Sequence, residues 1–369
     1  MVTAFDFCDD LGPEKIIHLH DPTGSGLRAI VVVDNVAAGP AIGGTRMAAD
    51  VSLQECFRLA RAMTLKNAAA GLPHGGAKSV IFADPGMPAD QKQQLVRAFA
   101  YAIRDVLDYI PGPDMGTDET CMAWVRDTIG RAVGLPRAIG GIPLDEIGAT
   151  GYGLATALDV AQEPCGFTLR GARVVVQGFG SVGKHAARFL AERGAVLVGA
   201  SDTSGTLHHP DGIDVAALIA FKDAGNGVAD FPGGTRQPGD AVIDIPCEIW
   251  IPAARPDVIH AGNVHRLQTR VIAQGANIPF TPEAEATLHR QGVWVLPDFI
   301  ANAGGVICAS VEYHGGSEGQ ARQVIAEKIA FNTRAVLESA LRSGCQPREA
   351  AVRLAGDRVR SAMALRRCH

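Results

Sequence analysis

The segment that most constrains the fold of this chain is "RVVVQGFGSVGKHAARFLAERG", residues 173–194. A β-branched run leads directly into a glycine-rich turn, and an amphipathic, alanine-containing stretch follows. In such a strand–turn–helix unit the first glycine permits the tight turn, the second lets the backbone approach a pyrophosphate, and the third lets helix pack on strand. The helix N-terminus adds N–H groups and positive potential. The predicted phosphate-binding residues are Gly178, Phe179, Gly180, Ser181, Val182 and Gly183.

The next predicted strand ends in Asp202, where an acid about 20 residues after the last glycine meets the adenosine ribose. A carboxylate there accepts hydrogen bonds from a 2′-hydroxyl and repels a 2′-phosphate. Thr203 and Ser204 follow and carry no cation. The sequence therefore favours NAD. NADP stays open, because a basic group could arrive from elsewhere in the fold.

The remaining pattern predicts two α/β domains. Residues 141–330 carry short apolar runs at 247–254, 270–277 and 293–298, typical of buried parallel strands with ligand loops at their carboxyl ends. Before them, residues 1–140 mix predicted strands with amphipathic helices, and the amphipathic segment 331–369 is expected to complete that first domain. The expected strands are 15–21, 27–36 and 78–84, the expected helices are 52–71 and 88–109, and 137–153 is the expected hinge or linker.

Composition limits the classes of function. A length of 369 residues suits two domains, and 34 basic against 39 acidic residues give no electrostatic reason to expect nucleic acid or an anionic membrane. The sequence carries neither a secretory signal pattern nor an apolar stretch long enough to span a bilayer. The eight cysteines are scattered without a C-x-x-C pair, which predicts no metal site and reduced thiols in a cytoplasmic protein.

A second glycine-rich stretch, "GLPHGGAKSVI" (71–81), does not fit a phosphate-binding P-loop. Ala77 separates the last glycine from Lys78, so the lysine comes one residue too late, and the stretch follows a helix and enters a strand. Lys66 precedes it on a predicted helix, and Asp114 follows on a Pro/Gly-rich loop. Two lysines and an aspartate on one small domain suggest an anionic substrate and proton transfer, since burial or a neighbouring cation can convert a lysine into a usable base. A solvated surface lysine is the alternative for each.

Five motifs together resemble the superfamily of glutamate, leucine, valine and phenylalanine dehydrogenases. They run in order over about residues 27 to 313: "MTLKNAAAGLPHGGAKSVI" (63–81), "GPDMGT" (112–117), "GFGSVG" (178–183), "AQGANIPFTPEAE" (273–285) and "PDFIANAGGV" (297–306). The resemblance implies a substrate domain, a Rossmann-type doubly wound NAD(P) domain and an active site in the cleft between them. It also implies reversible oxidative deamination of an amino acid in a homo-oligomer.

The resemblance assigns roles by position. Lys66 should bind the substrate α-carboxylate, Lys78 should be the general base that activates water, and Asp114 should assist proton transfer. Five further residues receive expected positions: Gly43 and Gly44 bring backbone against the substrate, Thr150 and Asn277 lie near the nicotinamide, and Asn302 lies near the cleft. Ala77 is a departure, because the family usually has a third glycine there.

Two positions bear on the substrate side chain. Glutamate dehydrogenases carry a lysine and a serine that hold the γ-carboxylate, and the matching positions here are Ile42 and Ala309. With Val306 and Gly112 these residues predict an apolar, fairly roomy wall suited to leucine, valine or phenylalanine, because an unpaired buried carboxylate is costly. Three alternatives remain: a shift of one residue that turns Ser310 to the pocket, a glutamate dehydrogenase with an altered pocket, and a non-catalytic nucleotide or amino-acid sensor.

Overall fold

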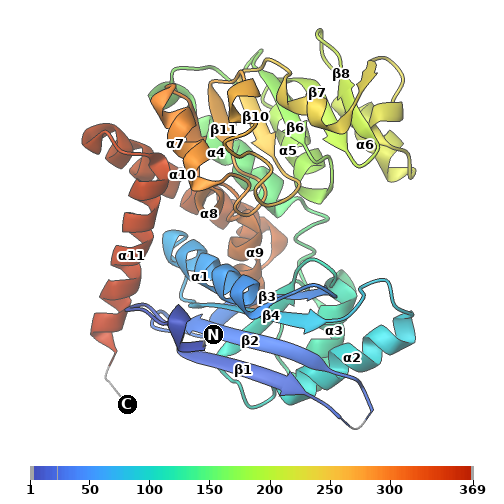
Figure 1. Cartoon of the computed structure of the whole chain (residues 1–369), viewed down its shortest axis with the longest axis vertical. Helices are drawn as coiled ribbons and strands as arrows, with labels where there is room; N and C mark the ends of the chain where they lie inside the picture. Colours follow the sequence, from blue (N-terminus) through green and yellow to red (C-terminus); the bar gives the residue numbers. More distant parts are fainter. Residues whose placement is uncertain (1–3, 23, 367–369) are drawn as a thin grey trace. The chain divides into compact units, whose positions relative to one another are not determined.

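The computed structural model describes residues 4–22 and 24–366, and these divide into two compact units (Figure 1). Unit 1 contains the described residues through Leu144, then Val306–Val324, then those from Arg353 onward. Unit 2 contains Asp145–Gly305 and Ile325–Val352. The first segment of unit 1 ends at Leu144, and residues 331–352 belong to unit 2.

Unit 1 is built on a five-stranded mixed sheet of order β1-β2-β4-β3-β5. Its strands are β1 (Lys15–His20), β2 (Arg28–Asn35), β3 (Ala41–Ala48), β4 (Gly76–Phe82) and β5 (Tyr109–Pro113). β1 and β2, and β2 and β4, pair antiparallel, whereas β3 pairs parallel with both β4 and β5. The parallel pairs bring the carboxyl ends of β3, β4 and β5 to one edge of the sheet.

Helices cover both faces of this sheet. On one face, Val80 of β4 and Val32 of β2 pack with Cys56 and Ala60 of α1 (Leu53–Ala69). On the other face, the neighbouring residues of the same strands pack with α2 (Ala89–Ala102) and α3 (Glu119–Ile129). Because side chains alternate along a strand, Lys78 lies on the α1 face together with Val80. Gly76 is on that face too, and it lets α1 lie directly on β4.

Several sequence-based boundaries are confirmed and others are corrected. Ser52 caps α1 by accepting a hydrogen bond from the backbone N–H of Glu55 at 3.1 Å, as its capping box predicts. The helix predicted to reach residue 109 ends at Ala102 instead. β3 was not predicted, because two glycines interrupt the β-branched pattern by which a strand is recognised. The strand expected from Lys78 onward starts two residues earlier, at Gly76, so Lys78 lies inside β4.

Unit 2 holds a seven-stranded sheet of order β12-β11-β10-β6-β7-β8-β9. Its strands are β6 (Arg173–Gln177), β7 (Val196–Asp202), β8 (Gly205–His208), β9 (Thr235–Gln237), β10 (Ile249–Pro252), β11 (Val271–Ala273) and β12 (Trp294–Leu296). The five strands from β12 to β7 are parallel, and β8 and β9 extend the sheet antiparallel. The predicted doubly wound nucleotide fold is confirmed.

The remaining helices are α4 (Ala149–Cys165), α5 (Ser181–Ala191), α6 (Val215–Asp223), α7 (Pro282–Arg290), α8 (Asp298–Ala301), α9 (Gly304–Tyr313), α10 (Glu318–Ser343) and α11 (Pro347–Leu365). α10 and α11 each contribute residues to both units. In the described part of the chain, we find no helix long and apolar enough to cross a membrane.

Part of the expected linker is instead the buried start of α4. A Cβ added at Gly151 would lie 2.5 Å from the backbone nitrogen of Ala186 in α5, and one at Gly153 would lie 3.2 Å from the carbonyl oxygen of Ala301. These glycines therefore serve close helix packing and not chain flexibility.

Gly76→Ala tests the contact between α1 and β4. The added Cβ would lie 2.0 Å from the backbone nitrogen of Thr64, so α1 must move off the strand. We expect a loss of about 3 kcal/mol or more in unfolding free energy, measured by denaturant titration. Gly319→Ala, on the exposed first turn of α10, is the control and should be neutral or slightly stabilising. Equal stability of Gly76→Ala and the wild type would contradict the close contact.

Candidate active site

The glycine-rich turn of unit 2 has the geometry that its sequence predicts. Gly178 adopts a positive φ of 90°, and a Cβ there would lie 2.8 Å from the backbone of Ala253 and Ala254. A Cβ at Gly183 would lie 2.1 Å from the carbonyl oxygen of Gly178, so this glycine permits the helix to pack on the turn. Nothing lies within 4 Å of a Cβ at Gly180, which leaves open space above the turn.

The start of α5 is suited to an anionic ligand. Gly180 is its N-cap residue, and no side chain of the described residues caps it, so its first N–H groups are available. Phe179 is fully buried and its backbone N–H donates to the Ser201 carbonyl at 2.8 Å, which fixes the turn against β7. Ser181 hydrogen-bonds through its hydroxyl to Asp145 at 3.2 Å. The open space and the uncapped helix fit the pyrophosphate of a dinucleotide.

Asp202 ends β7 as predicted, but its carboxylate is already engaged. It accepts hydrogen bonds from the backbone N–H and hydroxyl of Ser204, at 2.8 and 2.5 Å, and from the backbone N–H of Val228 at 3.1 Å. Lys222, at the end of α6, forms a salt bridge with the same carboxylate. Burial alone would raise the pKa of Asp202, but the hydrogen bonds from Lys222 and Ser204 hold it below its ordinary value. The basic group absent from the local sequence is thus supplied by α6.

Asn277 and Asn302, both assigned from the resemblance, lie together in unit 2. The side-chain amide of Asn302 donates to the carbonyls of Gly275 and Ala276, at 3.1 and 3.3 Å, and to the Asn277 side-chain oxygen at 3.2 Å. Asn302 therefore shapes the loop that follows β11. Thr150, the third assigned residue, lies half-buried in the first turn of α4.

A half-buried arginine that the sequence did not reveal supports the same loop. Arg348, at the start of α11, contacts Glu285 at 2.6 Å and Asp298 at 3.0 Å, and both carboxylates are at most 5% exposed. Asp298 in turn accepts from the backbone N–H of Ile278 at 2.8 Å, and Ile278 has a positive φ of 43°. This unfavourable backbone conformation is held in place by the carboxylate. No local signal could have linked residue 348 to a loop near residue 277.

In unit 1 the structure brings together Lys78 and Asp114, two of the residues singled out in the sequence. The Lys78 ammonium nitrogen lies 3.0 Å from a carboxylate oxygen of Asp114, and the lysine side chain is 4% exposed. Gly44 of β3 provides the space for this pair. A Cβ at Gly44 would lie 2.8 Å from the Asp114 Cβ and 2.9 Å from the Lys78 Nζ. Gly43 has a different role in packing, since its Cβ would overlap the carbonyl oxygen of Ala77.

Arg46 is a third member of this cluster that sequence reasoning missed. Its Nε donates to the same Asp114 oxygen at 2.8 Å, and its Nη1 contacts Glu55 of α1. Burial alone would raise the pKa of Asp114, but the cations of Lys78 and Arg46 hold it below the ordinary value, so Asp114 stays ionised. The alternation of β3 offered a signal, because Arg46 shares a strand face with Ile42 and Gly44.

Lys66 lies on α1, the helix that covers the face of the sheet carrying Lys78. Its side chain is buried, with 8% of the residue exposed. The adjacent Asn67 donates to the carbonyl of Gly75 at 2.5 Å and to that of Ile42 at 3.3 Å. These bonds tie the end of α1 to β3 and to the start of β4, so both lysines are held by the same framework.

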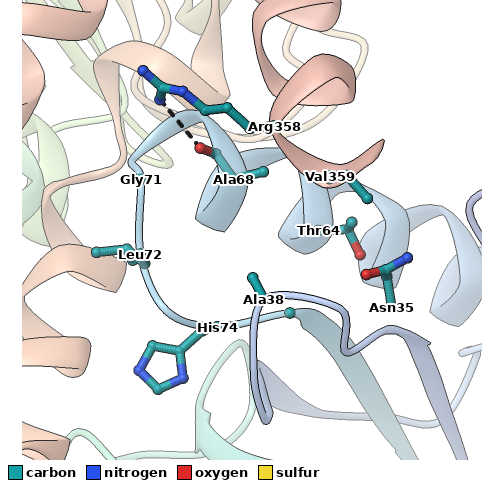
Figure 2. Close-up of a pocket in the computed structure, with 10 residues that line it drawn as sticks. Asn35, Ala38, Thr64, Ala68, Gly71, Leu72, His74, Arg358 and Val359 are labelled. Carbon is teal, nitrogen blue, oxygen red and sulfur yellow. Dashed lines mark hydrogen bonds between the residues drawn. The ribbon is translucent and has the colours of Figure 1, made fainter. Parts of the chain in front are cut away.

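The carboxyl end of α1 borders a cavity of 180 Å³ in unit 1. Figure 2 shows its wall, with Leu72 and His74 on the loop after α1 and Arg358 and Val359 on α11. Arg358 donates to the Ala68 carbonyl at 3.2 Å. A guanidinium at this end satisfies terminal carbonyls and complements the helix dipole, which stabilises the turn that contains Lys66.

The residues expected at the substrate side chain are apolar and buried, and Val133 lies beside them. Ile42 pairs in register with Ile110 and Gly76, and it shares the strand face of Gly44. The room expected beside Gly112 is filled by Val133, whose Cγ2 would lie 3.1 Å from an added Cβ. Val306 and Ala309 lie on α9 and are 8% and 5% exposed, while the alternative residue Ser310 is also buried at 4%.

Known proteins match the chain along both units. A family profile described as Glutamate/Leucine/Phenylalanine/Valine dehydrogenase matches residues 140–367, and one described as the Glu/Leu/Phe/Val dehydrogenase dimerisation domain matches residues 13–131. Glutamate dehydrogenase from Aeropyrum pernix is 36% identical over 356 residues, which cover 90% of this chain and 85% of that protein.

Two solved structures are similar in fold. The hetero-hexameric glutamate dehydrogenase from Thermus thermophilus, in a leucine-bound form, gives a TM-score of 0.88 at 32% identity, covering 97% of this chain and 91% of that one. L-Tryptophan dehydrogenase from Nostoc punctiforme gives a TM-score of 0.73 at 25% identity, with coverages of 96% and 98%. Both similarities extend over nearly the whole chain.

Arg348→Met tests the buried support of the Asn277 loop. Two carboxylates would lose their cation in a buried setting, which typically costs about 3–5 kcal/mol. We expect the apparent melting temperature to fall by on the order of 10 °C, measured by differential scanning fluorimetry. Arg173→Met breaks the exposed pair with Glu248 and should lower it by about 3 °C at most. Similar small shifts for both variants would show that Arg348 is not an essential support.

Proposed function

The chain belongs to the glutamate, leucine, phenylalanine and valine dehydrogenase family, and its enzymes are NAD(P)-dependent oxidoreductases acting on CH–NH2 donors. On that basis we propose that it converts an apolar L-amino acid to its 2-oxo acid and ammonia, reversibly, with NAD⁺ as hydride acceptor. Leucine, valine and phenylalanine are the substrates that we propose. The observation that carries the proposal is the buried Lys78–Asp114 pair with the apolar Ile42 on the same face of the sheet.

The proposed reaction begins with substrate binding. Lys66 binds the α-carboxylate through its ammonium group, which places the substrate Cα over the face of the sheet that carries Lys78. The nicotinamide, when bound, accepts the hydride that leaves Cα. Gly178–Gly183 and the N-terminus of α5 would hold the dinucleotide phosphates, and Thr150, Asn277 and Asn302 would border its nicotinamide end.

Loss of hydride leaves an iminium on the substrate, which water must attack. In its neutral amine form, Lys78 takes a proton from that water as the water oxygen bonds to the iminium carbon, and it becomes the ammonium. Asp114 accepts hydrogen bonds from Lys78 and from Arg46, so it holds the lysine in position and stabilises positive charge on the substrate. The Lys78 ammonium then gives its proton to the amino group and the C–N bond breaks, so ammonia leaves. As the C=O bond forms, the hydroxyl proton passes to Lys78, and the 2-oxo acid remains.

The apolar specificity rests on what Ile42 and Ala309 lack. Neither side chain can pair with or donate to a γ-carboxylate, and both are buried. An ionised carboxylate placed beside them would lose its hydration without compensation, at a cost of several kcal/mol. Val133 adds another apolar surface beside Gly112. A leucine or valine side chain therefore suits this apolar surface better than a glutamate side chain does.

Glutamate dehydrogenase is the second candidate. The Aeropyrum pernix relative bears that name at 36% identity, and the buried Ser310 offers a hydroxyl next to Ala309. If Ser310 faces the substrate, one hydrogen bond to a γ-carboxylate is restored. The match to a dimerisation domain supports oligomerisation, and we propose a homo-oligomer located in the cytoplasm.

The proposal is tested by a substrate panel. Leucine, valine, phenylalanine and glutamate are each supplied with NAD⁺, and NADH formation is followed at alkaline pH. We expect turnover of the apolar amino acids and little of glutamate, and we expect Lys78→Ala to lower kcat by about 100-fold or more while the fold is retained. Equal or better turnover of glutamate would overturn the apolar specificity. Full activity of Lys78→Ala would dismiss Lys78 as the base.

A double variant tests the two specificity positions directly. Ile42→Lys with Ala309→Ser restores a cation and a hydroxyl for a γ-carboxylate, so kcat/KM for glutamate should rise relative to leucine by about 10-fold or more. Ile42→Met with Ala309→Gly keeps the wall apolar and serves as the control. An unchanged glutamate-to-leucine ratio in the Lys/Ser variant would show that these positions do not face the substrate side chain.

A further inference from the structure

The adenosine-ribose end of the proposed dinucleotide site lies at the carboxyl end of β7. This assignment rests on the cofactor site of the proposed function. In folds of this type an acid at this position selects a 2′-hydroxyl by accepting its hydrogen bond and by repelling a 2′-phosphate. Both effects require a carboxylate with free lone pairs and an uncompensated charge. Asp202 has neither.

The lone pairs of Asp202 are filled from within the chain. One oxygen accepts from the backbone N–H and the hydroxyl of Ser204. The other accepts from the backbone N–H of Val228 and from Lys222. A carboxylate oxygen offers about two acceptor sites, so four donors leave no site for a ribose hydroxyl without displacing one of them.

The charge of Asp202 is compensated on its exposed side. Its side chain is 9% exposed, whereas that of Lys222 is 29% exposed. A ligand that approaches from solvent therefore meets more of the Lys222 side chain than of the Asp202 side chain. Of the four donors, Lys222 is the one with a flexible side chain, so it can turn toward a phosphate while Ser204 and Val228 keep Asp202 hydrogen-bonded.

A second cation stands next to this end of the strand. The Nη2 of Arg236, on β9, donates a hydrogen bond to the Ser204 carbonyl oxygen at 3.4 Å, and the Arg236 side chain is 62% exposed. It forms an exposed pair with Asp230 through its other terminal nitrogen. Together with Thr203, Ser204 and Gly205 it lines an open groove of 420 Å³ directly after β7. A phosphate in this groove could be reached by the Arg236 guanidinium and by the exposed Thr203 hydroxyl. Lys222, which pairs with Asp202 at the end of the same strand, lines a second cavity of 660 Å³ together with Gly180 and Ser181.

We propose that this site accepts a 2′-phosphate as well as a 2′-hydroxyl, so that the chain binds NADP(H) as well as NAD(H), and that Lys222 is the residue responsible. Lys222 cancels the repulsion from Asp202 and donates to the phosphate. Without it, Asp202 keeps its hydrogen bonds from Ser204 and Val228 but has an uncompensated charge and one free acceptor site, so it accepts the ribose hydroxyl and repels the phosphate. The single lysine thus sets the range of cofactors.

The test is a binding titration of NADH and NADPH, followed by nicotinamide fluorescence at low salt without any amino acid. We expect the two Kd values of the wild type to lie within about tenfold of each other. Lys222→Met should raise the Kd for NADPH by about tenfold or more, since a charged hydrogen bond to phosphate is lost. It should leave the Kd for NADH within about threefold of the wild-type value. Lys222→Arg should retain NADPH binding. Lys92→Met, on α2 of unit 1, is the control and should change neither value.

Two results would overturn the proposal. One is a wild type that binds NADPH more than about 100-fold weaker than NADH, and the other is a Lys222→Met variant with an unchanged NADPH-to-NADH ratio. Retained NADH binding in Lys222→Met shows that the variant is folded. Because no amino acid is present, failure of the substrate panel leaves this result untouched, whereas loss of the proposed cofactor site would abolish binding of both dinucleotides.

Discussion

The arrangement of unit 1 depends on one carboxylate oxygen that two cations share. Asp114 places this oxygen 3.0 Å from Lys78 and 2.8 Å from Arg46, with all three side chains largely buried. An ionised group in this setting is tolerable only when it is paired. This arrangement of Asp114 with two cations requires the parallel register of β3, β4 and β5 and a glycine at position 44. It also requires α1, because Glu55 of that helix contacts the Nη1 of Arg46. Sheet order, strand register and the packing of α1 are therefore linked to a single charge.

Unit 2 follows the same physical rule at two other places. Asp202 is neutralised by Lys222 from α6, and the buried acids Glu285 and Asp298 are neutralised by Arg348 from α11. In each case the acids border a loop of the proposed nucleotide site, and the cation comes from a helix outside that loop. Since loops hold strained backbone only when their surroundings fix it, as at Ile278, these cations determine the loop geometry as much as the loop sequence does.

The distance over which a signal acts explains what the sequence could predict. The glycine turn at Gly178–Gly183 and the Ser52 cap are local, because neighbouring residues contain the whole physical requirement, and the structure reproduces both. β3 was not predicted, because its glycines are explained only by the segments that pack on them. The roles of Arg46, Lys222 and Arg348 were not predicted, because the sequence around an arginine or lysine is the same whether or not a buried acid faces it. Pairing across the fold is a tertiary property that periodicity does not encode.

The segments that complete both units come late in the chain, and this affects the order in which the protein can form during synthesis. Unit 1 needs residues from Arg353 onward and unit 2 needs Ile325–Val352, including Arg348. Domains of many proteins fold in turn as they leave the ribosome, the first before the second is made. Here neither unit can be finished until the last helix has emerged. A nascent chain would thus carry the acids Glu285 and Asp298 without their cation from their own synthesis until Arg348 is added, a window in which chaperone binding would be useful.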